Sequence, residues 1–355
     1  MKAPAARYWH RVDPQRIQCD LCPRTCRLRP GQRGFCFVRQ NVDGQMALTT
    51  YGRSSGFCVD PIEKKPLYHV APGGAVLSFG TAGCNLGCKF CQNWHISTAR
   101  QMDALNDLAS PGLIARAAAR LGCQAVAYTY NDPVIFAEYA IDVAAACRRL
   151  GLLNLAVTAG YVTGAGRADF FAAMDAANVD LKAFSDDFYR RQTGGRLADV
   201  LDTLTYLVHQ TDVWVEITTL LIPGLNDSAE EVGQLVRWVA SELGPDVPLH
   251  FTAFHPAARL RQVPPTPPAS LRRARALGLE AGLHHVYTGN IADAEGSATY
   301  CPTCGVVVIT RRSMSLHHFG LTDQGRCPDC DTAVAGRWAG RPAQPFRGRQ
   351  PVRLG

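Results

Sequence analysis

Short apolar runs alternate with longer amphipathic stretches from residue 75 to residue 288. The apolar runs are rich in Val, Ile and Leu and predict strands at 75–78, 125–129, 153–158, 178–182, 213–221, 249–253 and 285–288. The amphipathic stretches predict helices over 113–121, 133–150, 168–174, 197–209, 228–243 and 271–281. Repeated strand-then-helix units predict a parallel sheet with right-handed crossovers. We therefore expect an α/β fold, a partial (β/α) barrel of the TIM type.

The segments on either side of this pattern differ from it. Residues 1–70 show little periodicity and predict a Cys-rich N-terminal module, whereas the barrel is expected over 71–292. Residues 293–335 contain two Cys pairs around a β-rich stretch and predict a small zinc-ribbon or rubredoxin-like module. The tail, 336–355, carries five Arg and no acid, and we expect it to be disordered. Without these five arginines the net charge of +7 falls to +2, so the charge does not indicate a nucleic-acid partner.

The cysteine pattern bears on the cellular compartment. Eleven of the 14 cysteines fall into three spaced clusters, and the sequence starts without the apolar core of a signal peptide. Clusters of this kind in such a chain indicate metal ligands rather than disulfides, so the expected compartment is the reducing cytoplasm. No window offers about 20 continuous apolar residues, so no membrane partner is expected.

The central cluster, Cys84-Asn-Leu-Gly-Cys88-Lys-Phe-Cys91, directly follows the first predicted barrel strand. An iron–sulfur cluster normally takes four cysteines, so three thiolates would leave one iron open to another ligand. That arrangement suits the binding and reduction of S-adenosylmethionine (SAM). The alternative is a zinc ion completed by His95, because zinc accepts three Cys and one His.

The C-x3-C-x2-C spacing, with the aromatic Phe90 before the last Cys, is the signature of the radical SAM superfamily. Flanking motifs extend the resemblance: Asp60-Pro-Ile-Glu-Lys-Lys-Pro-Leu67, Cys91-Gln-Asn-Trp-His-Ile-Ser97, Asn178-Val-Asp-Leu-Lys182, Thr219-Leu-Leu-Ile-Pro-Gly-Leu-Asn-Asp227 and Tyr287-Thr-Gly-Asn290. From about Cys19 to Cys330 the chain resembles the radical SAM member of the AmmeMemoRadiSam system, a family similar to the pyruvate formate-lyase activating enzymes.

This resemblance implies a [4Fe–4S] cluster on Cys84, Cys88 and Cys91 that cleaves SAM to methionine and a 5′-deoxyadenosyl radical. It also implies an electron donor such as flavodoxin or ferredoxin and, as further partners, the other proteins of the AmmeMemoRadiSam system. The radical would abstract hydrogen from a substrate that the sequence does not identify.

The resemblance also implies contacts to SAM. Lys182 and His255 are the candidates for its carboxylate, although Lys182 also fits a surface lysine and His255 a locally hydrogen-bonded loop residue. Asp132 stands where the superfamily often has Gly-Gly-Glu and would reach the SAM amino group with one methylene less. Thr158 and Asp180 match positions that ligate a monovalent cation in the activating enzymes. These residues follow or end predicted parallel strands, whose carboxyl ends meet at one edge of the sheet, so we expect a single site there.

Two further sets of four cysteines predict additional metal sites. The N-terminal set fits zinc, which we favour, or an auxiliary iron–sulfur cluster, and consists of Cys19, Cys22, Cys26 and Cys36. The C-terminal set predicts one structural zinc and consists of Cys301, Cys304, Cys327 and Cys330.

The sequence thus predicts a cytoplasmic radical SAM enzyme. One alternative within the same chemistry is a glycyl-radical-enzyme activase of the pyruvate formate-lyase activating type. An alternative of another class is a zinc-dependent binding or scaffold protein, which would need a basic, aromatic-rich surface, and only the Arg-rich tail offers such charge.

Overall fold

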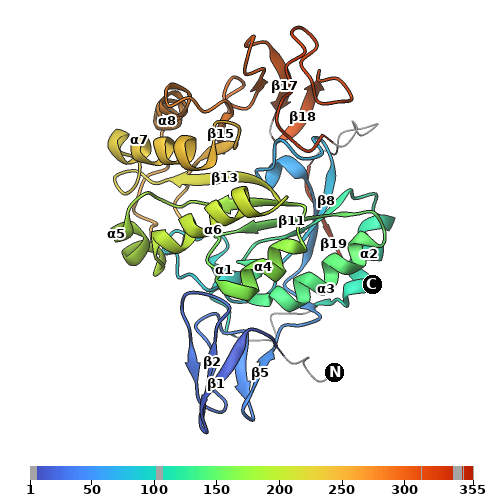
Figure 1. Ribbon diagram of the computed structural model, residues 1–355, viewed down its shortest axis with the longest axis vertical. Coiled ribbons are helices and arrows are strands. Elements are labelled where there is room, and N and C mark those ends of the chain that lie inside the picture. The colour runs from blue at the N-terminus through green and yellow to red at the C-terminus, as the bar shows by residue number, and fades with distance from the viewer. Residues whose placement is uncertain (1–5, 101–106, 313, 339–345, 347, 355) are drawn as a thin grey trace.

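The structure is a computed structural model that describes residues 6–100, 107–312, 314–338, 346 and 348–354. One nine-stranded sheet forms its centre (Figure 1). In spatial order its strands are β15 (Val286–Gly289), β14 (Leu249–Ala253), β13 (Trp214–Leu221), β12 (Ala176–Asp180), β11 (Leu153–Thr158), β10 (Ala125–Tyr128), β8 (Ala75–Phe79), β7 (Phe57–Pro61) and β19 (Gln350–Val352).

The strands β8 and β10 to β15 are parallel and stand in the order of the chain. Ala125 of β10, for example, pairs with Val76 on one side and with Leu153 on the other. Each crossover therefore moves on to the adjacent strand, as in a barrel, but β15 and β19 remain at the two edges of the sheet. The predicted α/β fold with a mostly parallel sheet is confirmed.

Helices between the strands cover one face of this sheet (Figure 1). They are α2 (Pro111–Arg120), η3 (Pro133–Phe136), α3 (Ala137–Arg148), α4 (Gly164–Ala172), α6 (Leu197–Gln210), α7 (Ala229–Trp238), η5 (Val239–Leu243) and α8 (Pro268–Glu280). The local sequence determines where α2 begins. The Ser110 hydroxyl caps this helix by accepting a hydrogen bond from the Leu113 amide, and Pro111 lies in the first turn. Among the described helices, none combines the length and the apolar character needed to cross a bilayer.

Three short elements lie outside the predicted pattern: α1 (Trp94–Ser97), α5 (Asp186–Phe188) and the π-helical turn η4 (Tyr189–Thr193). In addition, β12 begins two residues earlier than the predicted strand 178–182. Because β12 ends at Asp180, Lys182 lies in the loop beyond the strand rather than at its last position.

The N-terminal module lies at one end of the molecule (Figure 1). It consists of a three-stranded sheet, β1 (Trp9–Asp13), β2 (Arg16–Cys19) and β3 (Arg27–Leu28), and the hairpin β4 (Arg39–Val42) and β5 (Gln45–Leu48). A short pair, β6 (Arg53–Ser54) and β9 (Asp107–Leu108), and the turn η1 (Ile62–Lys64) lie nearer the central sheet. The predicted boundary at residue 70 differs from the structure, because β7 is fully buried and pairs antiparallel with β8.

The C-terminal module lies at the opposite end (Figure 1). Its sheet contains β16 (Thr299–Tyr300), β17 (Val307–Arg312) and β18 (Ser315–Phe319), over a small core of its own that includes Val308, Ile309 and Leu316. The predicted disorder of 336–355 does not hold for Gln350–Val352, which pairs with β7 at the sheet edge. Residues 339–345, 347 and 355 of that prediction lie outside the described residues.

Candidate functional site

The loop after β8 carries Cys84, Cys88 and Cys91. Asn131, which lies just beyond β10, forms hydrogen bonds with the first residues of this loop. The Asn131 amide group donates to the carbonyl oxygens of Gly83 at 2.8 Å and of Ala82 at 3.4 Å, and its side-chain oxygen accepts from the Thr81 amide. Tyr130, with φ of 72°, turns the chain so that Asn131 reaches back over the loop. Only the place of Asn131 after a predicted strand could have indicated these hydrogen bonds from the sequence.

The second half of the loop is attached to η4. The amides of Gly87 and Lys89 donate to the carbonyl oxygens of Thr193 and Gln192, at 2.7 and 2.9 Å. Phe90 is buried, and its ring lies 5.7 Å from that of Phe188. Two segments distant in sequence thus fix the three cysteines, which are all partly exposed, in one irregular loop.

These cysteines open into a cavity of about 890 Å³ at the carboxyl ends of the parallel strands. Asp132, Thr158, Asp180 and Lys182 also line it, as predicted from their positions at strand ends. His255 does not belong to this lining: its side chain is exposed, and its carbonyl oxygen accepts from Gln92 at 3.0 Å. The expected convergence therefore holds for every predicted residue of this site except His255.

Asp132 is a buried carboxylate that joins two strand ends. It accepts from the Thr158 hydroxyl at 2.9 Å and from the amides of Val134 and Ala159 at 3.1 and 3.2 Å. Burial raises the pKa of Asp132, although these hydrogen bonds oppose the shift. Both carboxylate oxygens already have protein partners, so Asp132 shapes the cavity wall before any ligand is present.

Lys182 is the cation of this cavity wall. Its Nζ lies 2.8 Å from the Asp180 carboxylate, and its side chain is 13% exposed. Burial acts to lower the pKa of Lys182, but the charge of Asp180 and then the Cys88 thiol outweigh it and raise the pKa above its usual range. Lys182 therefore carries a full positive charge beside the cysteine loop at neutral pH.

The three thiols fit a cluster better than a single ion. Of the described residues, Cys301, Cys304, Cys327 and Cys330 form a group whose sulfur atoms all lie within 4.8 Å, whereas Cys84, Cys88, Cys91 and His95 form no such group. One zinc ion needs ligands at that close spacing, but each thiolate of an iron–sulfur cluster binds a different iron. Burial also raises the pKa of Cys88 to about 12, so iron must displace a proton there.

Comparison with known proteins identifies the superfamily. The Radical SAM superfamily pattern matches residues 79–239, which include the cysteine loop and four of the parallel strands around the cavity. An uncharacterized protein of Methanocaldococcus jannaschii is 36% identical over 330 residues, which is 93% of this chain and 98% of that protein. Residues 79–239 form a radical SAM domain. A domain of this kind implies an enzyme with a [4Fe–4S] cluster and with SAM as co-substrate.

Two more distant similarities agree with this assignment. A pyruvate formate-lyase-activating enzyme of Clostridium pasteurianum is 26% identical over 159 residues, 44% of this chain and 65% of that enzyme. The crystal structure of Streptococcus suis SuiB bound to the precursor peptide SuiA has a TM-score of 0.50 at 13% identity, and the match covers 65% of this chain and 51% of SuiB. The second likeness concerns the fold alone.

A larger cavity of this radical SAM protein, with an empty volume of about 1950 Å³, adjoins the first. Thr218 and Thr252 line both cavities. Its wall also contains Glu63, which is buried, and Arg311 from β17 of the C-terminal module. The Arg311 guanidinium donates to the carbonyl oxygen of Tyr68 at 2.7 Å, which joins the module to the barrel at this wall.

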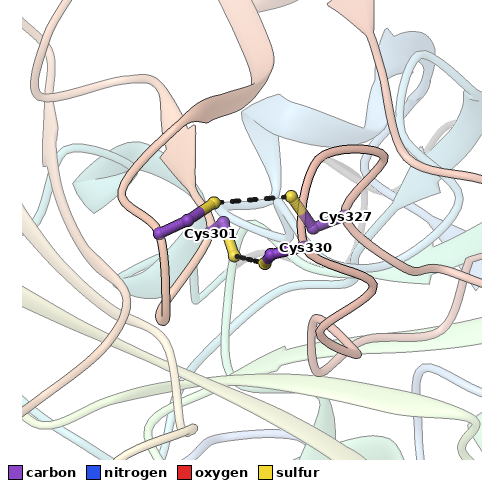
Figure 2. Close-up of side chains that lie close together, drawn as sticks. Cys301, Cys327 and Cys330 are labelled. Carbon is purple, nitrogen blue, oxygen red and sulfur yellow. Dashed lines mark hydrogen bonds between the residues drawn. The ribbon is translucent and has the colours of Figure 1, made fainter.

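The C-terminal cysteines approach one another from two loops (Figure 2). The Cys301 and Cys330 sulfurs lie 3.5 Å apart, and the Cys304 and Cys327 sulfurs lie 3.7 Å apart. Four thiolates on a tetrahedral zinc, at about 2.3 Å from the metal, would lie about 3.8 Å apart. The observed group fits one four-coordinate ion with no open position, as predicted for a structural site.

The N-terminal cysteines are brought together as well, but more loosely. Cys19 ends β2, while the other three lie in the loops that follow, and all four line one cavity beside the central loop. Cys19 and Cys36 are buried, and Cys22 and Cys26 are partly exposed. None of the 14 cysteines forms a disulfide in this structure.

Proposed function

We propose that this radical SAM enzyme binds its [4Fe–4S] cluster through Cys84, Cys88 and Cys91 and cleaves SAM in the 890 Å³ cavity. The observation that carries the proposal is the position of three cysteines without disulfides beside Lys182, all in the lining of one cavity. When bound, such a cluster supplies the electron that cleaves the sulfonium bond of SAM, which gives methionine and a 5′-deoxyadenosyl radical.

The protein's own residues would orient SAM. Lys182 would exchange part of its ion pair with Asp180 for the SAM carboxylate, a charge-assisted contact that needs a cation held in place. Asp132 and Thr158 would form the wall behind it, because they are already hydrogen-bonded to each other. The assignment of Thr158 and Asp180 to a monovalent cation stays a prediction, since Asp180 pairs with Lys182 here.

The second cavity is the proposed place of the substrate. Thr218 and Thr252 lie on the shared wall, so a molecule in the larger cavity would present a C–H bond to the radical formed in the smaller one. Glu63 and Arg311 would contact its polar groups. This arrangement makes the C-terminal module part of the substrate-binding wall, which its predicted structural role did not include.

The resemblance to the AmmeMemoRadiSam system extends the proposal to partners. We propose that an electron donor of the flavodoxin or ferredoxin type reduces the cluster in the cytoplasm, and that proteins of that system act with this enzyme. The similarity to a pyruvate formate-lyase-activating enzyme favours one second candidate, a glycyl-radical-enzyme activase. A glycyl radical detected by electron paramagnetic resonance (EPR) in a partner protein would favour that candidate.

The test is reductive SAM cleavage by the reconstituted full chain. With iron, sulfide and dithionite, wild type should convert SAM to 5′-deoxyadenosine, and Cys88→Ala should not. Cys123→Ala is the matched control, because Cys123 is a buried thiol of the core outside all three cysteine sets. Equal product from Cys88→Ala and wild type would refute the proposed cluster site.

A further inference from the structure

The N-terminal cysteines surround a small cavity with an empty volume of about 360 Å³. Beyond the four thiols, its lining includes Leu21, Arg24, Gly34, Arg39, Asn85, Val134 and Ile135. Three of these, Asn85, Val134 and Ile135, belong to the barrel, so the module alone does not complete the cavity. The space therefore lies between the N-terminal module and the barrel.

The spacing of the thiols disfavours a zinc ion. In the C-terminal module, all four sulfurs lie within 4.8 Å of one another, as one tetrahedral ion requires. Among the described residues, no three of Cys19, Cys22, Cys26 and Cys36 form such a group. Instead, the sulfurs of Cys26 and Cys36 each lie 3.7 Å from an ideal Cβ on Gly34, at the edge of the enclosed space. Thiols arranged around a void suit a polynuclear centre, in which each thiolate binds a separate metal atom.

A buried hydrogen-bond donor also faces this space. Arg39 is 2% exposed and lines the cavity, and its Nη1 pairs with the Glu138 carboxylate at 3.0 Å. Its Nη2 donates to the carbonyl oxygen of Arg7. Its Nε, however, has no hydrogen-bond partner of good geometry within the described part of the chain, although the guanidinium lies near enough to lower the pKa of the Cys19 thiol, which burial raises. A buried N–H without an acceptor is unfavourable, which indicates that an acceptor absent from the bare protein completes the site.

We propose that Cys19, Cys22, Cys26 and Cys36 bind a [4Fe–4S] cluster and that the Arg39 Nε–H donates a hydrogen bond to one of its sulfur atoms. The four thiolates occupy all four irons, so this cluster has no open position for SAM or substrate. The cluster is anionic, and the guanidinium of Arg39 offsets part of that charge. The proposal replaces the zinc that the cysteine spacing alone had favoured.

The proposed cluster would lie against the loop of the first. The Arg24 Nε donates to the carbonyl oxygen of Asn85, between Cys84 and Cys88, and Arg24 Nη2 donates to that of Gly194 at 2.9 Å. Arg24 thus joins the Cys22–Cys26 turn to the central cysteine loop. The identity of the metal centre on the N-terminal cysteines does not depend on whether the protein cleaves SAM.

The experiment removes the central site first. The full chain with Cys84→Ala, Cys88→Ala and Cys91→Ala is reconstituted anaerobically with iron, sulfide and zinc all present. The expected result is about four iron and about four acid-labile sulfides per chain, with an EPR signal after reduction. Sulfide distinguishes this cluster from a single iron in the C-terminal site. Zinc in place of iron and sulfide, or no sulfide at all, would overturn the proposal.

Further variants in this background locate the cluster. Cys22→Ser with Cys36→Ser should lose the iron and sulfide, whereas Cys58→Ser with Cys147→Ser, two buried thiols outside the sets, should keep them. Equal retention in both pairs would contradict the assignment.

The hydrogen bond from Arg39 to the cluster can be tested in the unmutated residue and in a variant. Protein labelled with ¹⁵N-arginine should show a weak ¹⁵N coupling to the reduced cluster by electron–nuclear double resonance. Arg39→Lys keeps a cation for Glu138 but removes the guanidinium N–H, so the midpoint potential should become more negative. No ¹⁵N coupling, or an unchanged potential in Arg39→Lys, would refute the role of Arg39.

Discussion

The carbonyl oxygen of Cys36 lies 2.0 Å from the position that a Cβ atom on Gly83 would occupy. Gly83 has φ of 79°, a conformation that favours glycine, and it directly precedes Cys84. The backbone of the N-terminal cysteine set therefore packs directly against the loop that carries the central set. Neither loop can move far without displacing the other.

Gly83→Ala should therefore disturb both metal sites. The new methyl group would meet a backbone atom and adopt a strained φ, at a cost of about 2–5 kcal/mol when typical overpacking and strain energies are combined. We expect a lower melting temperature and less iron bound in both cysteine sets.

Gly282→Ala is the matched control for this substitution. Gly282 also has positive φ, at 90°, but nothing lies within 4 Å of its Cβ position. The Gly282→Ala protein should lose only the stability that the strained φ costs, and it should bind as much iron as wild type. Equal losses in the two variants would contradict the importance of the Gly83–Cys36 contact.

Lys182→Met should weaken SAM binding about tenfold or more, because a charge-assisted contact contributes roughly 1.5–3 kcal/mol. The iron content should stay unchanged, since Lys182 donates to Asp180 and not to a cysteine. Equilibrium binding of SAM to the reconstituted protein provides the measurement. Arg190→Met, which removes an exposed cation paired with Asp187, is the charge control and should bind SAM normally. Equal affinity in wild type and Lys182→Met would remove Lys182 from the site.

Acid should destabilise the protein partly through His285. This side chain is buried, neither ring nitrogen has a partner among the described residues, and burial lowers the pKa of His285 from 6.5 to about 4. Between those values the unfolded chain binds a proton that the folded chain does not, so stability rises with pH across that window. The contribution of neutral His285 to the free energy of unfolding is complete above about pH 6.5. It declines as the pH falls toward 4, and the total loss is at most about 3 kcal/mol.

His285→Asn removes the titrating group, so the variant should lose less stability than wild type between pH 7 and pH 5. Denaturant unfolding at both pH values measures the two differences. Two further histidines of this region, His69 and His250, are also buried. Burial and then the charge of His285 lower the pKa of His69, so the loss of His285 also relieves His69 and adds to the expected difference. Parallel pH profiles for the two proteins would contradict the role of His285.

The repeating strand–helix pattern allowed the fold and most of the site to be predicted, because in a parallel sheet a residue's place at a strand end determines its position in space. Asp132, Thr158 and Lys182 reach one cavity for that reason. His255 does not, because Phe254 before it is fully buried and the chain then turns outward. That turn depends on Thr266, whose hydroxyl accepts from the Phe254 amide, a contact between distant residues.

The sheet edge was harder to predict. In β7, Asp60 interrupts the apolar pattern, and its burial is stabilised by Lys64 and Lys65, which contact its two carboxylate oxygens at 2.9 and 2.7 Å. The strand β19 pairs with β7 across almost 300 residues of sequence, and its Arg-rich surroundings resemble those of a disordered tail. Pairing at such separation leaves no local signal. For the N-terminal cysteines, the residue spacing did not reveal how far apart the sulfurs lie.

Cys304→Ser tests whether the C-terminal module serves only structure or also the substrate cavity. Loss of one of four thiolates should release the zinc, about one ion per chain, and expose the module to protease, because its core is small. SAM cleavage without substrate should survive, since none of the described residues of the module lines the 890 Å³ cavity. Arg311, however, lies on β17 of this module and lines the larger cavity, so substrate turnover should fall even where SAM cleavage persists. Cys147→Ser, a buried thiol of the barrel core, is the control and should keep its zinc and its protease resistance. Unchanged zinc content and digestion pattern in Cys304→Ser would refute the metal site, and unchanged substrate turnover after zinc loss would confine the module to a structural role.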